Sequence, residues 1–216
     1  MQTKLTFREC TMSQLDKLFS LQQMQKSTAL NSWLAGAYEL SEFEKKALLR
    51  LQEKLNRNVY HWNEQELVVN FVYPVFTFVN FTTDYFNDFA ERLITVQIGN
   101  HELSGRPDGI IATGFREPEI PFFCFQEYKP ESDPTGEPYG QCLAAMLAGQ
   151  TLNNADSPIY GCVVKGADWN FMILEDKKYT ISKRFVADDD EVFDIFRILQ
   201  CLKNILSEKY IVKIQK

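Results

Sequence analysis

Two acids and a lysine in the middle of the chain have the residue types and spacing of a reactive site. Asp108 follows Pro107 in a turn, and Glu127 and Lys129 come near the end of an apolar segment. Two residues apart on a strand, Glu127 and Lys129 point to the same face. Two carboxylates can hold a hard divalent cation through oxygen ligands. A lysine beside them can orient a water and offset negative charge on a phosphate. The pattern therefore predicts a small polar metal site.

The same residues also have structural interpretations. Asp108 could be an ordinary turn residue within RPDG, and Glu127 with Lys129 could form a surface pair on an exposed strand end. The apolar run before them argues against exposure, because Glu and Lys are rarely buried without partners. Without a metal, neighbouring carboxylates repel, so we expect at least one of them to have a raised pKa.

Two further residues are candidates for the same site. Asn63 and Glu66 form a capping-box pattern at the start of a helix, and Glu64 lies at its first turn. Glu64 is our candidate metal ligand, with Glu66 as the alternative. Gln141 lies among Ala, Leu and Met on a later helix, where an amide would need a hydrogen-bonding partner. It could equally be a helix surface residue.

Helices and strands that could position these residues follow from periodicity, caps and turn residues. The expected helices span residues 13–25, 41–56, 63–81, 139–153 and 191–206. Ser41 and Glu44 form the capping-box pattern that opens helix 41–56. An apolar stripe from Val192 to Leu206 lies along helix 191–206. The expected strands span residues 92–99, 109–114, 121–129, a hairpin over 159–174 and a short strand over 179–185. Asp188–Asp190 would cap the last helix.

Helix 63–81 and strand 121–129 carry more detailed expectations. Pro74 should kink or end the helix nearby. Its apolar positions at helical spacing are Leu67, Phe71, Val75 and Phe78. Strict alternation divides the strand into two faces, one with Phe123, Phe125, Glu127 and Lys129, the other with Phe122, Cys124, Gln126 and Tyr128.

The element order indicates an α/β fold, with a mixed central β-sheet flanked by helices and a helical N-terminal extension. We assign residues 1–60 to the extension and residues 61–216 to the main domain.

Composition excludes several classes of protein. The 216 residues carry a net charge of −6, which argues against an independent, tight binder of duplex nucleic acid. Only two histidines occur, and neither GxGxxG nor GxxxxGK[ST] is present. No apolar run is long enough to span a bilayer, and no secretory signal is evident. Five irregularly spaced cysteines suggest reduced, mostly buried thiols, so we expect a cytoplasmic protein without a membrane partner.

The candidate site residues resemble those of a known protein family. The PD and ExK residues at Asp108, Glu127 and Lys129 resemble those of the PD-(D/E)XK nuclease superfamily, especially the N-terminal nuclease domains of type I restriction-enzyme motor subunits. Those domains have an acid early in a helix, ten residues before a proline, as Glu64 is before Pro74. They also have a glutamine on the helix after the lysine.

The resemblance covers about residues 60 to 206. The glutamine motif of the family is often QxxxY, but Ala145 stands where the tyrosine would follow Gln141. The segment 158–174 is also similar to a hairpin of those domains, with a glycine, a turn and a tryptophan. The first sixty residues have no counterpart.

The resemblance implies a restriction-endonuclease-like core over residues 61–216 and a Mg²⁺- or Mn²⁺-dependent nuclease, with DNA as the favoured polymer. It implies Asp108, Glu127, Lys129 and Gln141 as catalytic residues and Glu64, Asp108 and Glu127 as metal ligands. The alternative is a catalytically idle nuclease-like fold that acts as a protein-binding or assembly module. A homodimer is compatible with either function.

Overall fold

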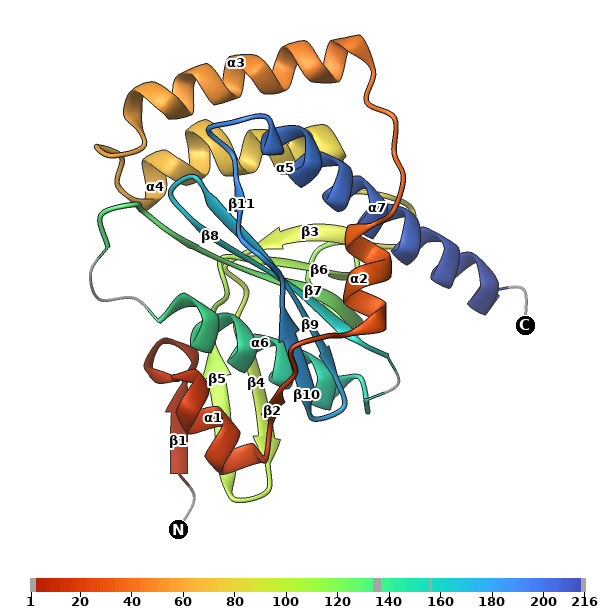
Figure 1. The fold of residues 1–216 in the computed structure, drawn as a ribbon. Helices are drawn as coiled ribbons and strands as arrows, with labels where there is room; N and C mark the ends of the chain where they lie inside the picture. The colour runs from red at the N-terminus through yellow and green to blue at the C-terminus, as the bar shows by residue number, and fades with distance from the viewer. Residues whose placement is uncertain (1–2, 134–136, 156, 215–216) are drawn as a thin grey trace.

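Two β-sheets and the helices that pack on them make up the fold, as the computed structural model shows for residues 3–133, 137–155 and 157–214 (Figure 1). The strand order of the larger sheet is β2-β10-β9-β8-β7-β6-β3, with β11 paired to β9, and that of the smaller is β1-β5-β4. The strands of the smaller sheet are β1 (Thr3–Thr6), β4 (Ile94–Ile98) and β5 (His101–Gly105). Those of the larger are β2 (Gln22–Gln23), β3 (Asn87–Ala90), β6 (Gly109–Thr113), β7 (Glu119–Lys129), β8 (Ile159–Lys165), β9 (Asp168–Glu175), β10 (Lys178–Ile181) and β11 (Phe185–Val186).

Parallel and antiparallel pairs occur together in the larger sheet. Strand β7 runs parallel to β8 and β10 runs parallel to β2, while the other neighbouring pairs are antiparallel. The expectation of a mixed sheet flanked by helices is therefore confirmed.

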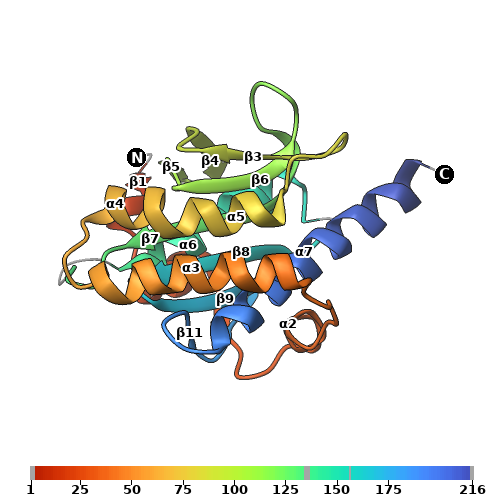
Figure 2. The ribbon, with the colours of Figure 1, turned by 90° about the horizontal axis from the view of Figure 1, so that it is seen from above.

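Helices cover both faces of the larger sheet (Figures 1 and 2). Their bounds are α1 (Met12–Phe19), α2 (Thr28–Leu34), α3 (Glu42–Asn58), α4 (Glu64–Leu67), α5 (Tyr73–Val79), α6 (Pro138–Leu152) and α7 (Glu191–Ile214), with a short 3-10 helix η1 (Phe7–Glu9) and a π-helix η2 (Val68–Val72). Helices α2, α3, α5 and α7 pack on one hydrophobic core. Helices α1 and α6, with the smaller sheet, pack on the other.

Local sequence signals explain several helix boundaries. Both expected capping boxes form, one between Ser41 and Glu44 and the other between Asn63 and Glu66. Asp189 Oδ1 accepts a hydrogen bond from the backbone N–H of Glu191 at the start of α7. The predicted caps of these helices are confirmed.

The helix expected over residues 63–81 is not a regular α-helix. The π-helical turn η2 comes just before Pro74, which lies in the first turn of α5 and has no N–H to donate. The wider turn rotates the residues that follow, so Phe76 and Val79 are buried and Phe78 is exposed. The expectation that Phe78 lies on the buried stripe was therefore wrong.

Strand β7 also departs from strict alternation. Its partner β6 pairs Ile111 with Cys124 but Ala112 with Phe122, which leaves Phe123 as an extra residue at a bulge. As a result Phe123 packs in the core beneath α5, and Phe122 packs with α6. The predicted faces of these two phenylalanines were reversed, because alternation cannot reveal a bulge.

The first sixty residues contain strands as well as helices, and the helix expected over residues 13–25 ends at Phe19, before strand β2. Strand β1 pairs in parallel with β5, and β2 pairs with β10. On α2, Trp33 is buried and donates a hydrogen bond from Nε1 to the Ile198 backbone oxygen, with an N···O distance of 2.9 Å. Residues 3–58 therefore pack into the same two cores as the rest of the chain.

The state of the cysteines and the character of the longer helices can be compared with what the composition predicted. All five cysteines are buried and free, as expected. Among the described helices, none combines the length and the apolar character that crossing a membrane requires.

Candidate active site

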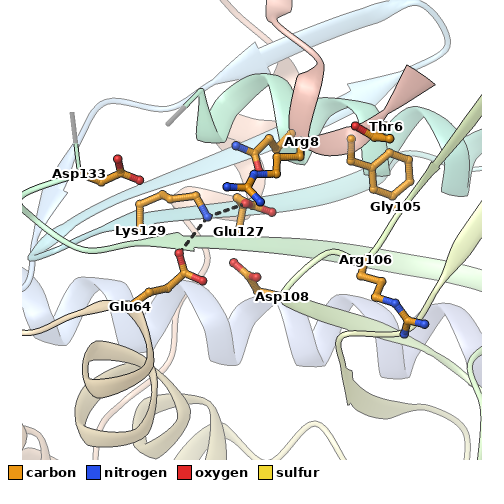
Figure 3. A pocket seen from close by; sticks show the side chains of 11 residues that line it. Thr6, Arg8, Glu64, Gly105, Arg106, Asp108, Glu127, Lys129 and Asp133 are labelled. Atoms are coloured by element: carbon orange, nitrogen blue, oxygen red, sulfur yellow. Dashed lines mark hydrogen bonds and ion pairs between the residues drawn. The ribbon is translucent and has the colours of Figure 1, made fainter. Parts of the chain in front are cut away.

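All five predicted site residues line one cavity of about 660 Å³. Figure 3 shows it at the end of β6 and β7, bordered by α4, β1 and η1. The predicted residues that line it are Glu64, Asp108, Glu127, Lys129 and Gln141. The structure thus brings together side chains from α4, β7, α6 and the turn before β6.

Strand register sets the position of Asp108 relative to Glu127. Gly109 pairs with Gln126 in the antiparallel β6–β7 ladder, so the next position places Asp108 across from Glu127. The Tyr128 backbone N–H donates to Asp108 Oδ2 with an N···O distance of 2.6 Å. Asp108 is therefore held by the strand that carries Glu127 and Lys129, and is more than a turn residue.

Lys129 connects the acids of two different elements. Its Nζ lies 2.9 Å from Glu127 Oε1 and 3.1 Å from Glu64 Oε2, and it donates to the Tyr128 backbone oxygen at 2.9 Å. The side chains of Lys129 and Glu127 are only 12% and 7% exposed, whereas that of Glu64 is 47% exposed. The pair on β7 is therefore not the exposed surface pair of the alternative interpretation.

Electrostatics in the cavity disfavour full ionisation of the acids. Burial, followed by the charge of Asp108, raises the pKa of Glu127 to about 8. Burial raises the pKa of Asp108 to about 6, against the opposing effect of Lys129. Burial also opposes the charge on Lys129, but Glu127, Asp108 and Glu64 outweigh it and raise the pKa of Lys129 above its ordinary range. The expected raised carboxylate pKa is confirmed in direction.

The two acids at the start of α4 have different positions. Glu66 completes the capping box by accepting the Asn63 backbone N–H at 2.9 Å, while Glu64 lines the cavity. The structure therefore favours Glu64 over Glu66 as the site residue. Gln141 is buried on α6 and is not a surface residue.

Several cavity residues were not among the sequence candidates. They are Thr6, Phe7, Arg8, Gly105, Arg106 and Asp133. Arg8 and Arg106 are cations, and the Arg106 guanidinium donates a hydrogen bond to the Glu91 backbone oxygen. Arg106 lies close enough to Asp108 in sequence to have been suspected, but Arg8 is a single basic residue in TFREC, and no local pattern marks it.

The oxygen atoms that line the cavity are of the type that binds hard cations. Glu64, Glu127 and the Tyr128 carbonyl already surround one cation, the ammonium group of Lys129. Carboxylate and carbonyl oxygens are also the ligands that Mg²⁺ takes. In the arrangement seen here, no three His, Cys, Asp or Glu side chains of the described residues stand close enough together to hold a metal ion. The cavity therefore contains ligands of the type that such an ion binds. Two of them, the carboxylates of Glu64 and Glu127, are in contact with Lys129.

No family model matches the chain, and no curated protein shows significant similarity to it. The functional argument therefore rests on the geometry and chemistry of this cavity.

Proposed function

We propose that the chain is a PD-(D/E)XK-type nuclease that hydrolyses phosphodiester bonds of nucleic acid, with DNA as the favoured substrate, in a Mg²⁺- or Mn²⁺-dependent reaction. One observation carries the proposal: Asp108, Glu127 and Lys129, predicted from their spacing, lie together in one cavity with Glu64 and Gln141. The mixed sheet flanked by helices also supports the restriction-endonuclease-like core that the resemblance implies.

Each residue has a role that its position allows. Asp108, Glu127 and Glu64 would hold the metal ion, which supplies positive charge beside the phosphate and lowers the pKa of a water molecule. Lys129 would position the attacking water and stabilise the additional negative charge of the transition state. Gln141 has both a donor and an acceptor and would orient the water or the lysine. In the reaction, the water oxygen bonds to phosphorus as the ester P–O bond breaks, and a proton goes to the leaving oxygen.

A cleavage assay with two Asp108 variants tests the proposal. Supercoiled plasmid and single-stranded DNA are incubated with Mg²⁺, Mn²⁺ or EDTA and with wild-type protein, Asp108→Asn or Asp108→Ala. We expect metal-dependent cleavage by the wild type and a loss of at least about 100-fold in both variants, because a carboxylate ligand is missing.

Asp108→Asn is the better matched variant. Its remaining oxygen can still accept the Tyr128 N–H, whereas Asp108→Ala leaves that donor unsatisfied at a cost of about 1–3 kcal/mol of stability. Thermal melting therefore checks that loss of activity in Asp108→Asn is not loss of folding. Cleavage by well-folded Asp108→Asn at the wild-type rate would contradict the assigned mechanism.

One observation favours the second candidate, an idle nuclease-like fold that serves as a binding or assembly module. Lys129 occupies the space between Glu64 and Glu127, and no metal-binding group is already assembled among the described residues. Against this, an unused cluster of buried like charges destabilises a fold. Metal-dependent stability separates the two functions, because only a working metal site would stabilise the folded chain when the metal binds.

A further inference from the structure

The N-terminal segment forms one wall of the cavity. Thr6, Phe7 and Arg8 line it, although they precede the other cavity residues by more than fifty positions in the chain. Figure 3 shows the Arg8 side chain on the same side of the cavity as Glu127. A part of the chain to which the resemblance assigns no role thus borders the proposed catalytic residues.

Packing on both sides fixes the backbone around Arg8. Phe7 and Cys10 are buried. A Cβ atom at Gly105 would lie 2.4 Å from the Phe7 ring, and one at Gly140 would lie 2.3 Å from the Cys10 backbone oxygen. Only glycine allows such close approach. The segment that forms this wall therefore packs against β5 and against α6, the helix that carries Gln141.

Among the described residues, Arg8 differs from Lys129 and Arg106 in that its side chain has neither an ion pair nor a hydrogen bond to another protein group. Lys129 is paired with Glu64 and Glu127. The guanidinium of Arg106 points away from the acids in Figure 3 and donates to the Glu91 backbone oxygen at 2.9 Å. None of the ion pairs between described residues includes Arg8.

The acidic lining of the cavity means that an anionic substrate needs a cation there that is not already paired. The acids of the cavity are Glu64, Asp108, Glu127 and Asp133. In their ionised forms these acids repel a phosphodiester anion, so binding requires positive charge that is not already neutralised. A guanidinium donates two parallel N–H bonds to phosphate oxygens and keeps its charge at every physiological pH.

We infer that Arg8 binds a backbone phosphate of the nucleic-acid substrate and holds the strand over Glu127 and Lys129, an inference that rests on the proposed nuclease function. The first sixty residues then contribute a substrate contact to the site. Arg8 acts in binding, so its loss weakens affinity for every sequence alike.

Fluorescence anisotropy with a labelled single-stranded DNA oligonucleotide tests the inference. Ca²⁺ replaces Mg²⁺ so that binding is measured without turnover, and KCl is varied. The proteins compared are the wild type, Arg8→Gln, Arg8→Lys and Arg50→Gln. Arg50 is an exposed arginine on α3 that does not line the cavity, so its variant controls for the loss of one positive charge.

We expect Arg8→Gln to bind about tenfold more weakly and its salt dependence to fall by about 0.7 in slope, the amount for one phosphate contact on a single strand. Arg8→Lys should recover part of the affinity, and Arg50→Gln should match the wild type. In the cleavage assay, Arg8→Gln should raise KM more than it lowers kcat. Melting curves show whether each variant is folded.

The other outcomes distinguish a failure of the Arg8 inference from a failure of the proposed nuclease function. A wild type that cuts DNA, with Arg8→Gln equal to Arg50→Gln in affinity and salt slope, overturns the role of Arg8 and leaves the nuclease intact. A folded wild type that neither binds nor cuts nucleic acid overturns both. If Arg8→Gln does not fold, Arg8→Lys decides: an unchanged affinity and an unchanged KM in this variant reject a bidentate phosphate contact.

Discussion

The surroundings of Glu127 and Asp108 disfavour the ionised forms of both acids. The two acids face each other across β6 and β7 at positions with little access to water, with a single lysine between Glu127 and Glu64. A bound cation would reverse this balance, since it would favour the ionised form of each acid. The cost of keeping the acids together in the metal-free protein should therefore appear as a pH dependence of stability.

Stability should fall as the pH rises from about 4 to about 8 in EDTA. The pKa values in the folded chain, about 8 for Glu127 and about 6 for Asp108, lie above their ordinary values of 4.5 and 3.8. In that range the folded chain binds protons that the unfolded chain has released, so deprotonation favours unfolding. Urea unfolding at several pH values measures the effect.

Glu127→Gln should reduce this pH dependence, because glutamine resembles the protonated acid and does not titrate. We expect the loss of stability between pH 5 and pH 8.5 to shrink by at least about 1 kcal/mol, the equivalent of about one pKa unit. Glu53→Gln removes an exposed carboxylate from α3 and serves as the control. Equal pH profiles for wild type and Glu127→Gln would show that the pKa of Glu127 is not raised in the folded chain.

Helix α6 places Gln141 at the cavity by packing very closely on β7. A Cβ atom at Gly149 would lie 2.3 Å from the Phe125 ring, and one at Gly161 on β8 would lie 2.6 Å from Met146 Sδ. These two glycines let the helix approach both strands of the parallel pair. The apolar residues all around α6 are consistent with a helix buried between the two sheets.

The contact between Gly149 and Phe125 can be measured with a double-mutant cycle. Gly149→Ala should destabilise the protein by about 1–3 kcal/mol through overpacking, even though alanine is the better helix former. In a Phe125→Leu background, which lacks the ring atoms involved, the same change should cost at least about 1 kcal/mol less. Urea unfolding of the four proteins gives the coupling, and additive effects would mean that the helix does not approach the strand so closely.

An acidic chain with a cluster of acids in one cavity should respond to divalent cations by a change in global stability. The net charge of −6 would attract cations but would produce only a weak, nonspecific effect. A specific site stabilises the folded state in proportion to the logarithm of ligand concentration. Melting curves therefore distinguish the nuclease from the idle module without a substrate.

Mn²⁺ or Mg²⁺ should raise the melting temperature of the wild type by several degrees. At about 100 times the Kd, binding adds about 2.7 kcal/mol, and each kcal/mol corresponds to about 2–4 °C for a chain of this size. Asp108→Asn should lose most of the shift, whereas Glu53→Gln should keep it. An unchanged wild-type melting temperature over a wide range of metal concentrations would favour the idle module.

The sequence by itself determined the features that depend on nearby residues. Cap residues begin α3, α4 and α7 where predicted, and the apolar stripe of α7 is buried from Val192 to Leu206. The spacing of Glu127 and Lys129 placed both on one side of a buried strand. Such features need only a few consecutive residues, because caps and side-chain alternation arise from local backbone geometry.

Only the tertiary structure decided which distant segments meet. Strands β1 and β2 obtain their partners from residues far along the chain, and the short strand β5 lies between the expected strands 92–99 and 109–114, where the sequence predicted no element of its own. The bulge at Phe123 is likewise set by pairing with β6. Arg8 enters the cavity because Gly105 and Gly140 let the N-terminal segment pack against β5 and α6. Contacts between residues far apart in sequence leave no local periodicity, so the folded arrangement alone brings Arg8 to the acids.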